Sequence, residues 1–290
     1  MNAHVEWRLG VAWQIAERLQ DHEGIRAIVV GGSVARGYAD VYSDLEMPLF
    51  WDDLPSDEVR KAIVADLGAE FLYGYDGPSN EDQLLIDGFQ VDFWQCSVAY
   101  EETVFEDVLK RFDTDLGSSN FMDTVRACIP LRGEALIARW KEMAQCYPDE
   151  LTVKNIAESL GRLDRGHLEV HSQRQNPTMV YGVIGELQKQ VFFILLALNR
   201  EYFPSHKWMY RSLAKMRLKP AGIARRFREA YTCPQAEAIR ETLSVVGETL
   251  ALVEEHCPQI DTSVVKKRLF VPRRVYEAPM VLWVQGGEKC

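Results

Sequence analysis

The chain has 290 residues, of which 47% are hydrophobic and 26% are charged, values typical of a folded globular protein and not of a disordered chain. Lys and Arg total 33 against 43 Asp and Glu, so the formal net charge is -10 and the overall field repels a nucleic-acid backbone. We therefore expect no nucleic-acid partner, and a chain of this length predicts two domains.

Membrane and secretion signals are weak. The longest uninterrupted apolar stretch covers residues 191–198, far short of the roughly 20 residues that span a bilayer. His4, Glu6 and Arg8 stand where a signal peptide would be apolar. Six cysteines are scattered without a C-x-x-C pair, which is typical of free thiols in a reducing compartment. We expect a cytoplasmic protein with no membrane partner.

The first half of the chain alternates helix and strand signals. Apolar residues at helical spacing predict a helix over 3–20, and β-branched residues predict a strand over 25–30. Gly31-Gly32-Ser33 then predicts a turn into a short helix, and a second strand follows over 44–51.

The next segment predicts a helix, a loop and a hairpin. Ser56 or Asp57 is a candidate N-cap, and Gly68 is a candidate helix stop. Residues 74–83 are polar and predict a loop. Asp87-Gly88 between two apolar runs is a strong hairpin signal, with one strand over 84–86 and the other over 89–94.

The rest of the chain predicts helices. Three helices complete the first half, over 99–112, 119–128 and 134–146. Five more form the second half, over 151–172, 178–200, 205–217, 220–231 and 234–257. The break at 146–151 places a domain boundary there, with an α/β domain over 1–148 (a mixed sheet with helices) and an α-helical bundle domain over 149–290. The tail has no clear period, and Val281–Val284 is a candidate late strand.

The glycine turn is a candidate phosphate-binding element. Glycines after a strand permit positive φ and a close approach of backbone N–H groups to an anion. Gly32 and Gly37 have the spacing of a Walker A loop, but Tyr38 and Ala39 replace the required Lys and Ser/Thr. The G-x-G-x-x-G dinucleotide pattern is also missing, so an ordinary strand-to-helix turn remains an alternative.

Asp44 and Glu46 are candidate metal ligands. Residues i and i+2 of a strand project to the same face, about 7 Å apart at Cα. Two carboxylates on a half-buried strand repel each other unless a cation neutralises them, and oxygen donors favour Mg²⁺ or Mn²⁺. Asp92 supplies a third carboxylate on a neighbouring predicted strand, a set that suits two-metal phosphoryl or nucleotidyl transfer. A solvent-facing pair on an edge strand is the structural alternative.

These residues resemble the nucleotidyltransferase superfamily that includes polymerase β. Gly32-Ser33 is followed after ten residues by Asp44-x-Glu46, and Asp92 lies on a later strand. Residues 32–36 and 42–47 are most similar to the kanamycin (aminoglycoside) nucleotidyltransferases, which have a D-x-E pair and an Arg three residues after the motif serine. The close resemblance covers residues 28–50.

The resemblance implies a role for each matching residue. Gly32, Ser33 and Arg36 would bind the nucleotide triphosphate, Asp44 and Glu46 would bind two Mg²⁺ ions, and Asp92 would be a third ligand or a base. In that family a Glu of the helical domain is the general base. The segment Glu158-Ser-Leu-Gly-Arg162 resembles the family pattern, although Arg replaces Lys, so Glu158 is the candidate base, with Asp164 and Glu186 behind it.

The implied activity is transfer of AMP from ATP to a hydroxyl group, with release of pyrophosphate. An aminoglycoside is the acceptor that the resemblance favours, which implies antibiotic resistance, and a polycation suits an acidic protein. A lincosamide or another metabolite is an alternative acceptor. A tRNA end or a protein hydroxyl, as in toxin–antitoxin systems, is a second alternative, and a non-catalytic nucleotide-binding interaction protein is a third.

Three other stretches have structural explanations. His167 and His171 are spaced for zinc on a helix, but Glu169 stands one place too late for the metalloprotease motif, which favours a polar helix face. The aromatic segment 203–208 predicts a turn between packed helices, with a substrate cleft as the alternative. The basic segment 266–274 indicates a solvated surface or a homodimer contact.

Overall fold

The computed structural model describes residues 2–75, 77 and 80–271, which form two compact units. Unit 1 comprises the chain up to Glu158 together with Phe192–Lys219, and unit 2 comprises Ser159–Val191 and the described residues from Pro220 onward. Each unit is therefore built from two segments of the chain. The periodicity of the sequence does not reveal that Phe192–Lys219 returns to unit 1. A domain division at residue 148 stays a prediction.

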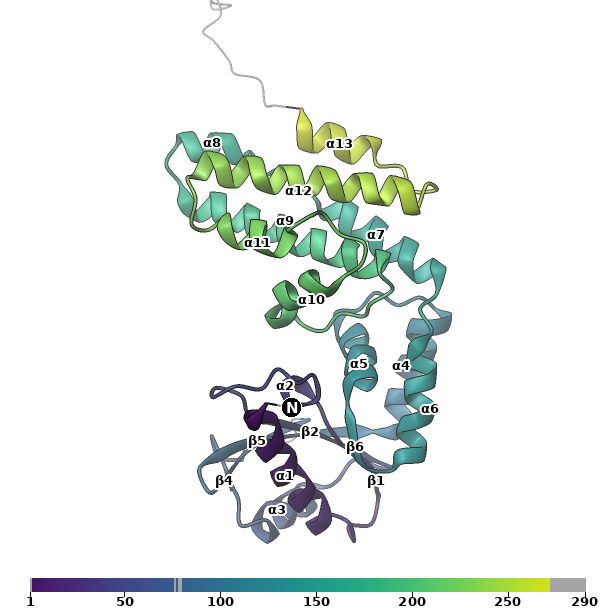
Figure 1. Ribbon diagram of the computed structural model, residues 1–290. Helices are drawn as coiled ribbons and strands as arrows, with labels where there is room; N and C mark the ends of the chain where they lie inside the picture. Colours follow the sequence, from purple (N-terminus) through teal and green to yellow (C-terminus); the bar gives the residue numbers. More distant parts are fainter. Residues whose placement is uncertain (1, 76, 78–79, 272–290) are drawn as a thin grey trace, which may run out of the picture. The chain divides into compact units, whose positions relative to one another are not determined.

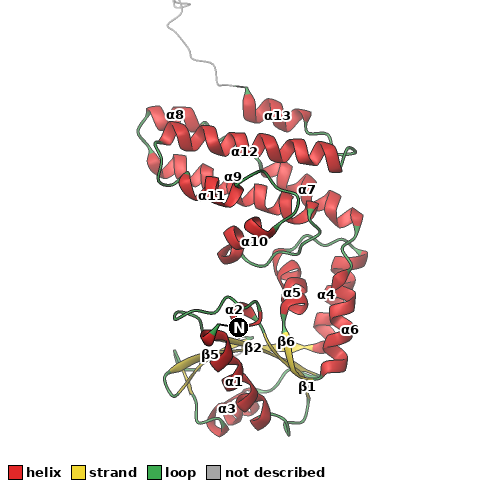
Figure 2. Cartoon of the chain, in the orientation of Figure 1, coloured by secondary structure: helices red, strands yellow, loops and turns green. Residues whose placement is uncertain are grey.

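Unit 1 contains a mixed β-sheet, which confirms the α/β prediction (Figure 2). Within the described residues the sheet has six strands in the order β3-β4-β5-β2-β1-β6, with β2 and β5 parallel and the other neighbouring pairs antiparallel. The strands are β1 (Ile25–Val30), β2 (Leu45–Trp51), β3 (Glu70–Phe71), β4 (Glu81–Ile86), β5 (Phe89–Ser97) and β6 (Ile129–Arg132).

The strand predictions were correct in the centre of the sheet and wrong at its edges. The sequence pattern misses β3 and β6, which are short edge strands, and β6 contains Pro130 beside the end of a helix. The loop prediction over 74–83 is wrong from Glu81 onward, because β4 begins there and pairs with β5. The hairpin is confirmed, with positive φ at both Asp87 (49°) and Gly88 (77°), as a type I′ turn requires.

Helices cover both faces of the sheet in unit 1 (Figure 1). One core contains alternate residues of β2 such as Leu45 and Met47 packed with α1 and α3, and the other contains Phe50 and Trp140 packed with α4, α5 and α6. The helices of this unit include α1 (Ala3–Arg18), α2 (Gly32–Ala35), α3 (Asp57–Asp66), α4 (Val98–Lys110), α5 (Leu116–Ala127), α6 (Glu134–Gln145), the 3₁₀ helix η1 (His206–Trp208) and α10 (Met209–Lys215). The predicted N-cap at Ser56 is confirmed, since its side chain accepts from the Val59 N–H.

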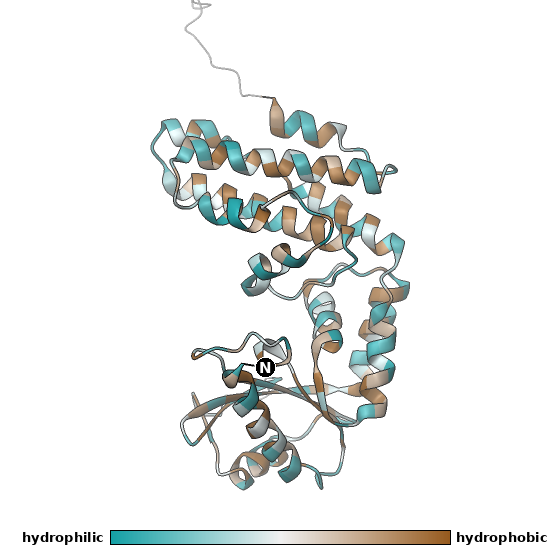
Figure 3. Cartoon of the chain, in the orientation of Figure 1, coloured by the Kyte–Doolittle hydropathy of each residue, from teal (hydrophilic) through white to brown (hydrophobic). Residues whose placement is uncertain are grey.

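The described part of unit 2 is helical, and its helices alternate hydrophobic and hydrophilic residues (Figure 3). Its helices are α8 (Leu168–Gln173), α11 (Ile223–Glu229), α12 (Gln235–His256) and α13 (Ser263–Phe270), and α7 (Asp149–Arg162) and α9 (Pro177–Leu198) each contribute residues to both units. A single helix over 151–172 is wrong, because the backbone has positive φ at Gly166 and His167. The basic tail segment begins inside α13, and Val281–Val284 lies outside the described residues. A bundle arrangement of these helices stays a prediction.

One helix in the described part of the chain, α9, is long and apolar enough to cross a membrane by length and composition alone. Just over half of its apolar window, 56%, is buried inside the protein. A buried core helix meets the same criterion, so α9 gives only weak evidence for a membrane span.

Glu101 is a buried carboxyl group that makes the stability of the fold depend on pH. It lies in the first turn of α4 and is 9% exposed. Burial raises its pKa from 4.5 to about 7, against a smaller opposing effect of its hydrogen bond with Cys96. The folded state therefore binds more protons than the unfolded state between these values, and the free energy of unfolding falls as the pH rises through this window.

We predict that Glu101→Gln flattens this pH dependence. The wild-type protein loses up to about 3 kcal/mol of stability through Glu101 between pH 4.5 and pH 7, and the neutral amide does not ionise. Urea unfolding at pH 5 and pH 8 measures the difference. Glu142→Gln, at an exposed position of α6, is the control and should keep the wild-type slope. Equal slopes in all three proteins would contradict the prediction.

Candidate functional site

The sheet brings the three predicted carboxylates to one place. Glu46 on β2 and Asp92 on β5 are direct partners in the parallel register, so their side chains project from the same face of neighbouring strands. Asp44 immediately precedes β2 and stands two residues before Glu46, the spacing at which side chains of an extended chain project to the same side. Asp44, Glu46 and Asp92 are called the carboxylate group below.

Electrostatic coupling shows that the carboxylate group is close enough for mutual repulsion. The pKa of Asp92 is raised to about 6, mainly by burial and also by the charges of Asp44, Glu81 and Glu46, against a hydrogen bond from Gln90. Burial and then the charge of Glu46 raise the pKa of Asp44. Asp44 and Asp92 are thus each harder to ionise than an ordinary aspartate. A cation bound between them would offset both the burial and the repulsion from neighbouring carboxylates.

The glycine turn packs directly on Glu46. The Gly31 N–H donates to the Glu46 carbonyl oxygen at 2.9 Å, which fixes the turn beside the second residue of β2. Gly32 has φ +55°, and a Cβ atom at this position would lie 2.4 Å from the Glu46 carboxyl carbon. Glycine at position 32 suits the positive φ, and a larger residue there would force the flexible Glu46 carboxylate to move.

The remaining predicted residues of the turn differ in their surroundings. Ser33 is 7% exposed at the start of α2. The Arg36 guanidinium donates to the Gly32 carbonyl oxygen at 3.0 Å and forms an ion pair with Asp123 of α5. Arg36 thus braces the turn from the α5 side, and phosphate binding by Gly32, Ser33 and Arg36 stays a prediction.

Two cations beside the carboxylate group were not predicted from the sequence. Lys207 of η1 donates to Glu46 at 3.1 Å, and its charge lowers the pKa of Asp44. Arg8 of α1 is 2% exposed, and its guanidinium binds the Ser43 carbonyl oxygen through two nitrogens, at 3.0 and 2.6 Å. A signal for Arg8 exists, because it shares the apolar face of its helix with Val5 and Ala12. The local sequence around Lys207 carries no such signal.

The candidate base Glu158 lies in α7, where it accepts a hydrogen bond from the Thr114 hydroxyl at 2.8 Å. Asp164 accepts from the Gly166 N–H at 2.8 Å, and Glu186 accepts from Gln190 at 2.6 Å; both belong to unit 2. A role for any of these three acids as general base stays a prediction.

The carboxylate group fits a divalent cation by the chemistry of its donors, since hard oxygen ligands with excess negative charge suit Mg²⁺. Within the described residues, no group of three or more His, Cys, Asp or Glu side chains has the spacing of a metal site as it stands. Glu46 instead holds Lys207, and Asp92 holds Gln90 at 3.0 Å. Ion binding would therefore require these side chains to exchange partners.

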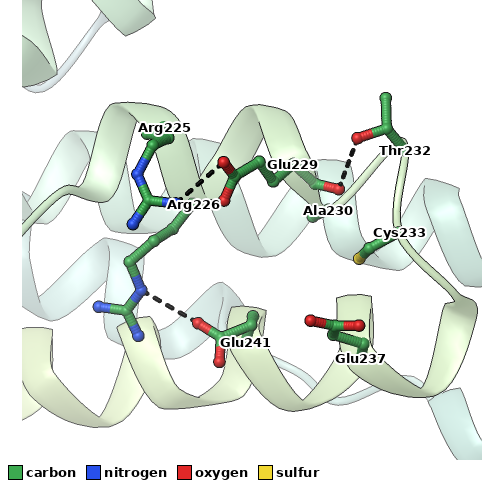
Figure 4. Close-up of a pocket in the computed structure, with 8 residues that line it drawn as sticks. All are labelled: Arg225, Arg226, Glu229, Ala230, Thr232, Cys233, Glu237 and Glu241. Atoms are coloured by element: carbon green, nitrogen blue, oxygen red, sulfur yellow. Dashed lines mark hydrogen bonds and ion pairs between the residues drawn. The ribbon is translucent and has the colours of Figure 1, made fainter.

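Each unit contains a pocket lined by described residues. In unit 2, a pocket of about 430 Å³ lies between α11 and α12 (Figure 4). Its charges largely satisfy one another, because Arg225 pairs with Glu229 and Arg226 pairs with Glu241. In unit 1, a pocket of about 560 Å³ is lined by residues that include Arg36 and is described below as the Trp208 pocket.

The comparisons with known proteins give limited similarities. Residues 120–209 match a family described as "Domain of unknown function (DUF4037)". No match is found among the curated proteins. A nucleotidyltransferase-like protein from Exiguobacterium sibiricum is similar in structure, with 9% sequence identity and a TM-score of 0.42 over 86% of this chain and 77% of that chain. Similarity at this level does not assign an activity.

We predict that Gly32→Ala destabilises the protein more than Gly37→Ala does. Both glycines have positive φ, at 55° and 71°, so alanine carries a similar backbone cost at each. Only at position 32 does the new methyl group overlap the Glu46 carboxylate, whereas nothing lies within 4 Å at position 37. We expect an additional loss below about 1 kcal/mol, measured by urea unfolding, because the carboxylate ends a flexible side chain that can move aside. Equal losses would contradict the prediction and show that the Glu46 carboxylate moves aside at no cost.

Proposed function

We propose that the protein is a metal-dependent nucleotidyltransferase that transfers AMP from Mg-ATP to a hydroxyl group and releases pyrophosphate. The observation that supports this most directly is the placement of Glu46 and Asp92 as register partners, with Asp44 coupled to both, beside a glycine turn bonded to the Glu46 backbone. Carboxylates next to a glycine-rich turn are the elements that nucleotidyl transfer requires.

In this proposal, Asp44 and Glu46 hold Mg²⁺, with Asp92 as a third ligand or as the base that accepts the proton of the acceptor hydroxyl. Bound Mg²⁺ supplies charge neutralisation at the phosphate oxygens. Gly32 and Ser33 lie against the phosphates through backbone N–H groups and the serine hydroxyl. Lys207 exchanges Glu46 for a phosphate oxygen when the nucleotide binds, because both partners are anionic. Arg8 holds the Ser43 carbonyl and so fixes the approach to Asp44.

The acceptor is the least constrained part of the proposal. An aminoglycoside-type antibiotic is the acceptor that the sequence resemblance favours, and a lincosamide or another small metabolite remains an alternative. Pyrophosphate release from ATP and Mg²⁺, measured across a panel of aminoglycosides, lincosamides and phosphorylated hydroxyl compounds, tests the activity and the acceptor class together. Absence of release with every acceptor would overturn the proposed transfer to a small molecule.

We predict that Asp44→Asn lowers pyrophosphate release by about 100-fold or more, because the amide is a weak ligand and carries no charge. The same change should not lower the free energy of unfolding. Burial and Glu46 raise the pKa of Asp44, so the ionised side chain is disfavoured in the folded protein and a neutral amide removes that cost.

Asp53→Asn is the matched control, since Asp53 is exposed in the loop after β2. It should retain wild-type activity and stability. Full activity in Asp44→Asn would contradict a catalytic role for the carboxylate group, and a large loss of stability would indicate a structural role instead.

A further inference from the structure

The Trp208 pocket belongs to unit 1, and it is linked to the glycine turn through Arg36, which lines it and donates to the Gly32 carbonyl oxygen at 3.0 Å. It has a volume of about 560 Å³, which is within the range that accepts a small molecule. Its lining includes Arg36 and Tyr38, Asp123 of α5, Glu201 after α9, and Trp208 and Lys215 of the returning segment. No residue of the Gly31–Ser33 turn and no member of the carboxylate group lines it.

The acidic groups of the pocket are already opposed by arginines. Asp123 forms an ion pair with Arg36, and Glu201 lies 3.6 Å from Arg126. Burial raises the pKa of both acids, which further limits the negative charge they present.

The cations of the pocket are not compensated in the same way. Among the residues that the structure describes, Lys215 and Arg217 have no carboxylate partner, and the Lys215 ammonium donates to the Tyr38 hydroxyl, a neutral group. Arg211 does not line the pocket, but its guanidinium lies 4.6 Å from the centre of the Tyr38 ring. The pocket therefore carries excess positive charge in a protein whose net charge is -10.

One wall of the pocket is aromatic. The rings of Tyr38 and Trp208 are 5.1 Å apart. The indole Nε1 of Trp208 is buried and has no hydrogen-bond partner within the described structure. A buried N–H without an acceptor is costly. Because this nitrogen is closed to solvent, the pocket offers a ligand the faces of the two rings and not this N–H.

We propose that the Trp208 pocket binds the acceptor, and that this acceptor is an anionic small molecule with a planar ring. A phosphate or carboxylate would pair with Lys215 and Arg217, and the ring would pack on Tyr38 and Trp208. A polycation such as an aminoglycoside would meet repulsion there. This inference rests on the proposed function, because it names the acceptor of that reaction.

The same chemistry is present in the donor nucleotide, so the test must separate the two sources. Phenyl phosphate is the probe, and binding is measured by titration calorimetry without ATP or Mg²⁺. We expect binding that weakens as salt rises, no binding of phenol, and no binding of kanamycin at the pocket. Binding that persists with a saturating non-hydrolysable ATP analogue and Mg²⁺ supports an acceptor site. Displacement by the analogue would assign the pocket to the donor and overturn the proposal.

Charge variants place the binding in this pocket. Lys215→Ala and Arg217→Ala should each weaken phenyl phosphate binding by about tenfold, because each removes a charge-assisted contact. Both side chains are exposed, so the variants should unfold like the wild type. Arg240→Ala, an exposed arginine of α12, is the control and should bind normally. Unchanged binding in both pocket variants would overturn the assignment.

Asp44→Asn separates this inference from the proposed function. It should bind phenyl phosphate as the wild type does, because Asp44 does not line the pocket. If pyrophosphate release occurs with a cationic acceptor and phenyl phosphate does not bind, the pocket assignment fails while the transferase proposal stands. If phenyl phosphate binds and no acceptor supports release, the transferase proposal fails, and with it the assignment of the ligand as an acceptor.

Discussion

The parallel pairing of β2 with β5 is the constraint on which the candidate site depends. Strand residues alternate between faces, so a shift of one residue in this register would place Asp92 opposite a core residue and point it away from Glu46. The register is held by burial, because Leu45 and Met47 of β2 and Val91 and Phe93 of β5 all enter the same hydrophobic core. The apolar residues on one face therefore determine where the acids on the other face lie.

Concentrating like charges in this way is unfavourable, and the surrounding residues offset the cost. Lys207 supplies a positive charge at Glu46, and Gln90 donates to Asp92. Arg8 donates to the Ser43 carbonyl oxygen, and the Gly31 N–H donates to the Glu46 carbonyl oxygen. These two hydrogen bonds hold the backbone on either side of Asp44. The group is thus stabilised by contacts that an incoming cation or phosphate can replace, a property suited to a binding site.

The sequence could predict the site as far as local periodicity reaches. Asp44 and Glu46 follow from alternation within one strand, and Asp92 follows from alternation within a hairpin whose turn is encoded by Asp87-Gly88. Lys207 lies 161 positions from Glu46, and no local pattern relates them. The edge strand β6 was missed for a related reason: its four residues form a strand through pairing with β1, and Pro130 is atypical of a strand interior. Periodicity within a segment does not show which distant segments pack against each other.

The return of Phe192–Lys219 to unit 1 has a consequence for the order of events during synthesis. This segment is joined to the sheet-bearing part by contacts such as the Phe203 N–H with Ser119 and the Tyr202 hydroxyl with the Cys146 carbonyl. About 50 further residues after Glu158 must leave the ribosome before those contacts form. Until then, Glu46 has no ion pair with Lys207, and the apolar surface that Tyr202 will cover is exposed to solvent. During synthesis there is thus an interval in which all strands of the sheet have been made but the carboxylates near Glu46 still lack the positive charge of Lys207.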